Sequence, residues 1–273
     1  MAESNESEPY RPTPMPSVRP VTVHDILAAL RAGINDFLRA PLFGLFFGGV
    51  YAVGGLFILA SLMYFEMVWL IIPIAIGFPL IGPFAAVGLY EVSRRLANNE
   101  PLGWRSILGV VLDQRHRQLG WMSFVVLFIF WVWIYLVRIL LALFFGFKSF
   151  SSVEGFFQLV MTTNEGLVFL AVGTIVGAFL AFILFSATVT AMPLLLDRDI
   201  DFISAMITSF KSVLMSPSAM LGWGIVVTVL GIAAMLPAFL GMIVILPVLG
   251  HATWHLYVRA IIRDEDGTAD GRA

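Results

Sequence analysis

Cysteine is missing from all 273 residues of this chain, and charged residues make up only 12% of it. Without cysteine, disulfide bonds, thiolate metal sites, cysteine-ligated iron–sulfur clusters and cysteine nucleophiles are excluded. Soluble domains carry about 25% charged residues. A chain with about half that share has too little polar surface to enclose a large apolar core in water. Hydrophobic residues make up 59% of the chain. The composition therefore predicts a polytopic membrane protein whose apolar surface faces lipid.

The motifs of soluble catalysis are missing as well. The sequence contains no Walker A loop, dinucleotide-binding fingerprint, H-E-x-x-H or G-x-S-x-G motif. Its apolar runs contain no aspartate, which argues against an intramembrane hydrolase with paired aspartates. No basic cluster is interleaved with aromatic residues outside those runs, which argues against nucleic-acid binding. We therefore expect no enzyme activity, no cofactor and no nucleic-acid partner.

Six apolar runs long enough to cross a bilayer follow one another along the chain. A membrane-spanning helix needs about 20 mostly apolar residues. The last apolar stretch, residues 221–258, is too long for one span, and Pro237 is the expected turn between two short ones. We predict an all-α bundle with spans near residues 42–64, 68–90, 119–147, 167–196, 219–236 and 239–257.

The lysines and arginines predict how this bundle is oriented. Of the 16 basic residues, 14 fall before the first span, after the last span, or in the second and fourth connections. The positive-inside rule places these segments and both termini in the cytoplasm. Residues 1–20 are acidic and then proline-rich, so we expect them, like residues 263–273, to be disordered tails. A single transmembrane domain is expected over residues 21–262.

Three amphipathic stretches, each before an odd-numbered span, are expected on the cytoplasmic side. Their apolar residues recur at spacings of three, four and seven, which is the helical period. The stretches begin near Val23, Trp104 and Ile203. We expect such helices to lie in the membrane interface or to pack under the bundle. One amphipathic helix followed by two spans, occurring three times, predicts an internal repeat. Pro41 and Pro217, each 16 residues after an aspartate, support it for the first and third units.

Two segments carry a resemblance to a known family. Residues 82–95 read Gly-Pro-Phe-Ala-Ala-Val-Gly-Leu-Tyr-Glu-Val-Ser-Arg-Arg, and residues 250–257 read Gly-His-Ala-Thr-Trp-His-Leu-Tyr. Both resemble signatures of domain of unknown function 2189, a family of bacterial inner-membrane proteins, and the resemblance extends roughly over residues 21–264. It implies an inner-membrane location and a six-helix layout. It implies no reaction, because the family has no established activity.

Some members of that family are labelled cytochrome c oxidase subunit I, and the histidines of this chain disagree with that label. A haem–copper core needs about six histidine ligands, and this chain has four histidines. His251 and His255 share a helical face, so they can bind a metal or respond to protons. With Trp254 and Tyr257 they also resemble an anchor at the membrane interface. No third ligand is evident on a neighbouring span, so we favour a structural or interfacial role and predict no metal site.

Arg138 and the second span supply the other candidate positions. Arg138 is the one charge well inside an apolar run. It can have a functional role or extend its side chain to the far interface, and we favour the second. In the second span, Pro79, Gly82 and Pro83 lie among six prolines and glycines. Proline frees backbone carbonyls that can line a cavity, whereas close helix packing, which we favour, explains the same composition.

Two functions are compatible with these patterns. The favoured hypothesis is a non-enzymatic accessory or assembly protein of a membrane complex, with the lipid bilayer and other membrane proteins as partners. The alternative is a small transporter or lipid-handling protein with a cavity along the second and last spans.

Overall fold

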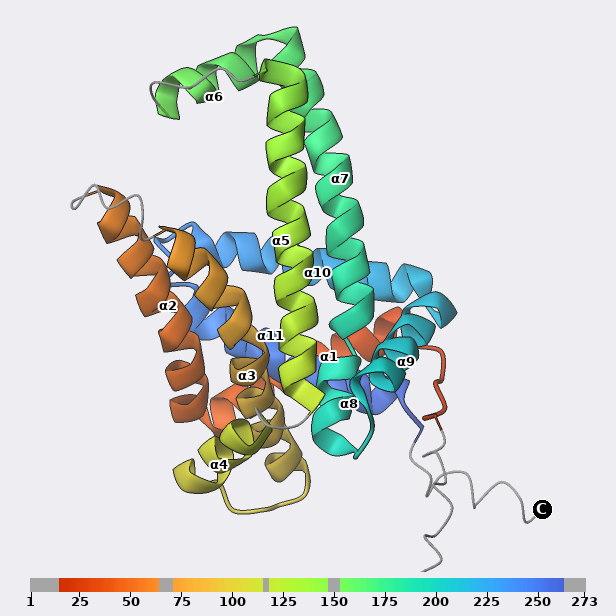
Figure 1. The fold of residues 1–273 in the computed structure, drawn as a ribbon. Coiled ribbons are helices and arrows are strands. Elements are labelled where there is room, and N and C mark those ends of the chain that lie inside the picture. The colour runs from red at the N-terminus through yellow and green to blue at the C-terminus, as the bar shows by residue number, and fades with distance from the viewer. Residues whose placement is uncertain (1–14, 64–70, 115–117, 147–152, 263–273) are drawn as a thin grey trace, which may run out of the picture.

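The computed structural model describes residues 15–63, 71–114, 118–146 and 153–262, which form helices with short connections (Figure 1). No strand occurs in these four ranges, and an isolated β-bridge pairs Val18 with Ile261. The predicted all-α fold is confirmed. The helices are α1 (Val23–Arg39), α2 (Pro41–Met63), α3 (Ile71–Ala97), α4 (Trp104–Gln114), α5 (Gln118–Phe145), α6 (Val153–Thr162), α7 (Asn164–Thr188), α8 (Ala191–Asp197), α9 (Phe202–Met215), α10 (Pro217–Met235) and α11 (Met242–Ala260).

Local signals in the sequence start two of the amphipathic helices. The Thr22 hydroxyl accepts a hydrogen bond from the Asp25 N–H, and the Asp25 carboxylate accepts one from the Thr22 N–H. This capping box satisfies two backbone donors at the start of α1. Asp201 caps α9 by accepting a hydrogen bond from the Ser204 N–H at 2.9 Å. The three predicted amphipathic helices are present as α1, α4 and α9.

Helices α1 and α9 expose many of their large apolar side chains. On α1, Leu27 and Leu38 are 50% and 69% exposed, and the buried side includes the stripe Ala29, Gly33 and Asp36. Helix α9 likewise exposes isoleucine and leucine side chains and buries serine and threonine side chains. In a soluble protein, large apolar side chains are mostly buried and serine and threonine side chains are mostly exposed. The outward apolar faces therefore fit helices that lie in a membrane interface.

α1 packs closely across α11 in the core of the molecule. A Cβ at Gly33 would lie 2.6 Å from the Ala252 nitrogen and 2.7 Å from the Val248 oxygen. The two helix backbones are therefore in contact, and only glycine fits between them. Around this crossing, Trp223 of α10 and Leu256 of α11 are 1% and 0% exposed.

The two ends of the described chain pair with each other beside this crossing. The Arg19 N–H donates a hydrogen bond to the Ala260 carbonyl, and the Ile262 N–H donates one to the Ser17 carbonyl. Val18, between them, is 7% exposed. The disordered tail predicted over residues 1–20 is therefore wrong from Ser17 onward. Residues 1–14 and the tail predicted at 263–273 lie outside the described residues.

Four helical stretches in the described ranges are long and apolar enough to cross a membrane. They are Pro41–Ala60, Gln118–Phe145, Asn164–Asp197 and Pro217–Met235, with mean hydropathy between 1.9 and 2.7. In Figure 1 the hairpin of α5 and α7 projects beyond the other helices, with α6 at its tip, and α10 runs across its direction. The most apolar parts of the two hairpin stretches have no buried residue. Helices so apolar and so exposed need lipid around them.

The prediction of six spans is confirmed only in part. The predicted spans at residues 68–90 and 239–257 form α3 and α11, which are not among the four stretches found in the described residues. In α11 the reason is its C-terminal half, which carries His251, His255 and Arg259 and lies largely in the core. Polar side chains lower the hydropathy of this half, and neighbouring helices take the place of lipid around it.

The predicted span at residues 167–196 is broken near its end. α7 ends at Thr188 and α8 begins at Ala191. At the break, the Thr190 N–H donates a hydrogen bond to the Ser209 hydroxyl at 3.2 Å, and the hydroxyls of Thr190 and Ser212 lie 3.2 Å apart. Side chains of α9 therefore supply partners at a point where the helical ladder is interrupted.

The turn expected at Pro237 is present. α10 ends at Met235 and α11 begins at Met242. Between them, Ala238 and Phe239 adopt positive φ angles of 50° and 66°, which reverse the chain.

Candidate functional site

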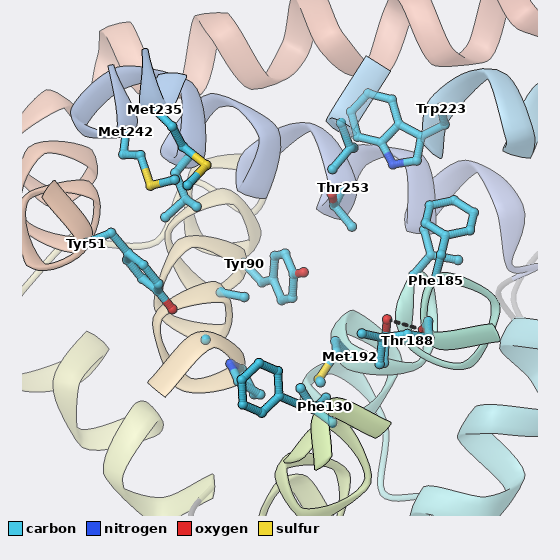
Figure 2. Close-up of a pocket in the computed structure, with 18 of the residues that line it drawn as sticks. Tyr51, Tyr90, Phe130, Phe185, Thr188, Met192, Trp223, Met235, Met242 and Thr253 are labelled. Carbon is cyan, nitrogen blue, oxygen red and sulfur yellow. Dashed lines mark hydrogen bonds between the residues drawn. The ribbon is translucent and has the colours of Figure 1, made fainter. Parts of the chain in front are cut away.

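A cavity of about 690 Å³ lies between the helices. Figure 2 shows its lining, which comes from α2, α3, α5, α7, α8, α10 and α11 and from the turn before α11. Pockets that bind small molecules measure about 300–1,000 Å³ and are mostly apolar, with a few polar groups. The described lining residues include no charged side chain, and their polar groups belong to Tyr51, Tyr90, Thr188, Thr253 and Trp223. The cavity therefore has the size and character of a site for an uncharged, apolar ligand.

Small residues of α3 create part of this space. Gly82, Pro83 and Ala86 line the cavity. Further along the same helix, the ring of Phe47 fills the place of a side chain at Gly88, where a Cβ would lie 2.1 Å from a ring carbon. The two explanations for the glycines of α3 therefore hold at different positions. The helix packs closely at Gly88, and it borders the cavity at Gly82, where a Cβ would lie 3.3 Å from the Tyr51 hydroxyl.

The polar groups of the cavity wall differ in their hydrogen bonding. The hydroxyls of Thr188 and Thr253 donate hydrogen bonds to carbonyls one turn earlier in their own helices, at 2.7 and 2.8 Å. Tyr51 has a partner of its own. The Tyr90 hydroxyl points into the open space in Figure 2, and none of its hydrogen bonds is found among the described residues. The Tyr90 hydroxyl therefore has a proton available to a ligand.

A buried polar network joins α1, α3 and α11. His255 Nε2 lies 2.7 Å from Asp36 Oδ2, and His251 Nδ1 lies 2.8 Å from Ser93 Oγ. The Ser93 hydroxyl also contributes to lowering the pKa of the Asp36 carboxyl, which connects the two contacts. Asp36, Ser93 and His251 are 4%, 0% and 0% exposed. Because a buried carboxylate without partners is costly, this network allows Asp36 to sit in the core.

Hydrogen bonding keeps Asp36 ionised. Burial by itself raises the pKa of this carboxyl, but the hydrogen bonds from His255 and Ser93 outweigh burial and lower the pKa below its ordinary value of 3.8. His251 Nε2 is buried without a hydrogen-bond partner among the described residues.

An ionic cluster closes the C-terminal end of α3. The Glu91 carboxylate, whose side chain is 1% exposed, accepts hydrogen bonds from Arg94 at 2.8 Å and from Arg95 at 2.6 Å. Arg94 also reaches Glu100, beyond the end of the helix, at 3.2 Å. The hydrogen bond to Glu91 raises the pKa of the Arg94 guanidinium. This cluster ties the helix end to the turn that follows and takes no part in the cavity lining.

The two histidines singled out from the sequence both lie on α11, but their hydrogen-bond partners lie on two different helices. His251 faces Ser93 of α3, whereas His255 faces Asp36 of α1. No group of three or more histidine, aspartate or glutamate side chains that could hold a metal ion is found within the described ranges. The predicted interfacial anchor is wrong for its aromatic members, because Trp254 and Tyr257 are 1% and 2% exposed. They pack in the core around the network instead of facing a membrane surface.

The remaining predicted positions lie apart from the network. Arg138 is exposed on α5, contributes nothing to the cavity lining and forms no ion pair with any residue whose side chain is described. Both of its proposed roles stay open. Gly82 and Pro83 line the cavity, whereas the side chain of Pro79, on the same helix, lies outside the described part of the chain.

Sequence reasoning missed Asp36, Ser93 and Tyr90. Asp36 looks like a surface residue of an amphipathic helix, and its signal is its place three residues after Gly33, on the side of α1 with small residues. Ser93 and Tyr90 carry no comparable signal, because their roles depend on which helices face α3.

The family comparison confirms the resemblance over part of the chain. Residues 70–197 match the model of DUF2189, a family described as predicted integral membrane protein. This match and the apolar helices show that the chain is a multi-pass integral membrane protein. The segment at residues 82–95 falls within the match, and the segment at residues 250–257 falls outside it. No curated protein and no solved structure matches the chain.

Proposed function

We propose that this DUF2189 protein binds an apolar molecule of the bilayer in its cavity and acts as a small transporter or lipid-handling protein. The cavity is the main support for the proposal. It has a volume of about 690 Å³ and a mostly apolar lining, and it lies among helices apolar enough to cross a membrane. A bound water needs two to four polar partners, and this lining offers few. An apolar group gains free energy on entering such a space, and the surrounding bilayer is a source of apolar groups.

The topology that we propose has six spans, with α3 and α11 crossing the inner membrane of a bacterium and both termini in the cytoplasm. The distribution of the 16 basic residues supports it. The order of helices supports an internal repeat, because Pro41 and Pro217 are the first residues of α2 and α10, each directly after an amphipathic helix. Internal repeats of this kind occur in transporters.

The accessory or assembly role stays a prediction. It differs from the cavity proposal in requiring a protein partner, with the cavity empty or filled only incidentally. We propose no catalytic role for any residue, in keeping with the missing catalytic motifs.

A cavity-filling substitution tests the proposed function. Ala86 lines the cavity, so Ala86→Phe places a ring in it. Ala171 is exposed on the apolar helix α7, so Ala171→Phe makes the same chemical change outside the cavity. Each chain is purified from its native membrane in mild detergent, and mass spectrometry identifies the lipids and proteins that co-purify.

We expect a near-stoichiometric apolar molecule on the wild type and on Ala171→Phe, and its loss from Ala86→Phe. Thermal unfolding checks that both variants are folded. The proposal fails if folded Ala86→Phe retains the same bound molecules as the wild type. A stoichiometric protein partner on all three chains, with no bound apolar molecule on any, supports the accessory role instead.

A further inference from the structure

We infer that the ligand of this cavity is an uncharged lipid-soluble molecule with a carbonyl oxygen, which accepts a hydrogen bond from the Tyr90 hydroxyl. The inference rests on the proposed function and adds the chemical class of the ligand. It starts from the Tyr90 hydroxyl, which points into the cavity in Figure 2.

The side chains that line the cavity indicate the charge of the ligand. The described lining holds no acidic, basic or imidazole side chain. Glu91, the next residue after Tyr90, is paired with Arg94 and Arg95 and is not part of the lining. A charged group bound here would lose its water without gaining a counter-ion, which is strongly unfavourable. The site therefore selects a neutral molecule.

The hydrogen-bonding group of the ligand is inferred from the hydrogen-bond donors of the cavity wall that have no acceptor among the described residues. The hydroxyls of Thr188 and Thr253 donate their protons to backbone carbonyls of their own helices. Tyr90 retains its proton, and the indole N–H of Trp223, on another wall of the cavity, forms no hydrogen bond among the described residues. Both groups are donors, and an indole N–H can only donate. An oxygen that accepts a hydrogen bond, such as that of a ketone, quinone or ester carbonyl, complements these donors.

Packing holds the Tyr90 hydroxyl in place before a ligand arrives. The Tyr90 ring stacks on Trp254, with 6.4 Å between the ring centroids. Trp254 is itself 1% exposed, and Tyr90 sits on α3 beside Ser93 of the buried network. A donor fixed in this way loses little conformational freedom on binding. Tyr90 is therefore suited to orient one end of an otherwise apolar molecule.

Two sources in a membrane supply this chemistry: quinones, whose ring carries two carbonyls, and ester lipids such as diacylglycerol. Four probes separate the possibilities for the full chain in mild detergent. They are a prenylated 1,4-naphthoquinone, the matching prenylated naphthalene without oxygen, a diacylglycerol, and a long-chain fatty acid that is ionised at neutral pH. Dissociation constants are measured for the wild type, Tyr90→Phe and Tyr135→Phe. Tyr135 is 55% exposed on α5 and does not line the cavity, so it is the matched control.

We expect at least one carbonyl-bearing probe to bind the wild type more tightly than the naphthalene and the fatty acid. Tyr90→Phe should weaken that probe by roughly 3- to 10-fold, the value of one hydrogen bond, without weakening the naphthalene. Tyr135→Phe should leave all four dissociation constants unchanged. Tighter binding of the naphthoquinone than of the diacylglycerol identifies a quinone as the source, and the reverse order identifies an ester lipid.

The inference is overturned if the naphthalene binds as tightly as both carbonyl probes, if the fatty acid binds most tightly, or if folded Tyr90→Phe binds every probe like the wild type. In those cases Ala86→Phe decides whether the proposed function survives. If it abolishes binding of the naphthalene, the cavity remains a site for apolar molecules and only the ligand class is wrong. If no probe binds the wild type, both proposals fail.

Discussion

His255 and Asp36 are 219 residues apart in the chain, yet their side chains meet at 2.7 Å. The contact depends on Gly33, one turn before Asp36, where the backbone of α1 touches that of α11 at Ala252. Close backbones bring a short aspartate side chain within reach of an imidazole on the other helix. The polar contact and the close packing therefore form one unit, and each can be tested separately.

Asp36→Asn tests the ionic part of this unit. The substitution keeps the shape of the side chain but removes the charge that His255 and Ser93 stabilise. We expect a loss of about 1–3 kcal/mol in the free energy of unfolding near neutral pH, seen as a lower Tm in detergent. An unchanged Tm would mean that the amide replaces the carboxylate in full and that the charge contributes nothing.

The same variant gives a pH dependence of known sign. The pKa of Asp36 is lower in the fold than its ordinary value of 3.8. The carboxylate therefore stabilises the fold above that value, and this contribution is lost as the pH falls through the folded pKa. The Tm difference between wild type and Asp36→Asn should shrink as the pH falls below about 4. A difference that grows on acidification would contradict the assignment.

Gly33→Ala tests the close packing. Its Cβ would lie 2.6 Å from the Ala252 nitrogen, which is backbone and cannot move aside cheaply. We expect a loss of about 1–3 kcal/mol, typical of overpacking. Gly49→Ala on α2 is the control, because its Cβ would meet nothing within 4 Å, and it should leave the Tm unchanged or raise it. Equal effects at the two sites would show that α1 and α11 do not pack as closely as described.

Glu91→Gln tests the ionic cluster at the end of α3. Glu91 is buried and accepts hydrogen bonds from both Arg94 and Arg95. Removing its charge leaves two arginines facing a neutral amide, and we expect a loss of about 1–3 kcal/mol, since both arginines keep some contact with water. Glu100→Gln, on the exposed side of the same cluster, should change the Tm little. The reverse order of the two effects would rule out Glu91 as the centre of the cluster.

The absence of cysteine makes the proposed topology directly measurable. Ser106 on α4 and Thr162 at the end of α6 are both exposed, and a cysteine at either site is the only thiol of the chain. In intact cells, a membrane-impermeant thiol reagent that reaches the periplasm should label Thr162→Cys, and it should label Ser106→Cys only after lysis. Labelling of Ser106→Cys in intact cells would reverse the proposed orientation.

Much of the helical layout was predictable because its signals are local. The turn at Pro237 and the starts of α1 and α9 each depend on a few neighbouring residues. The break between α7 and α8 was not predictable, because residues 167–196 are continuously apolar and the hydrogen-bond partners at Thr190 come from α9. The role of α11 was misjudged for a similar reason. Its length suits a short span, but neighbouring helices bury its polar half.

By itself, the sequence determined that the protein belongs in a membrane, that it is helical, and that its amphipathic segments stand between apolar ones. These properties depend on composition and on a period of 3.6 residues, both readable within one segment. Only the tertiary structure decided that Asp36 meets His255, that Tyr90 faces open space, and that Gly82 borders a cavity while Gly88 is filled by Phe47. Those relationships depend on which helix faces which, and helices far apart in the chain come together only through packing.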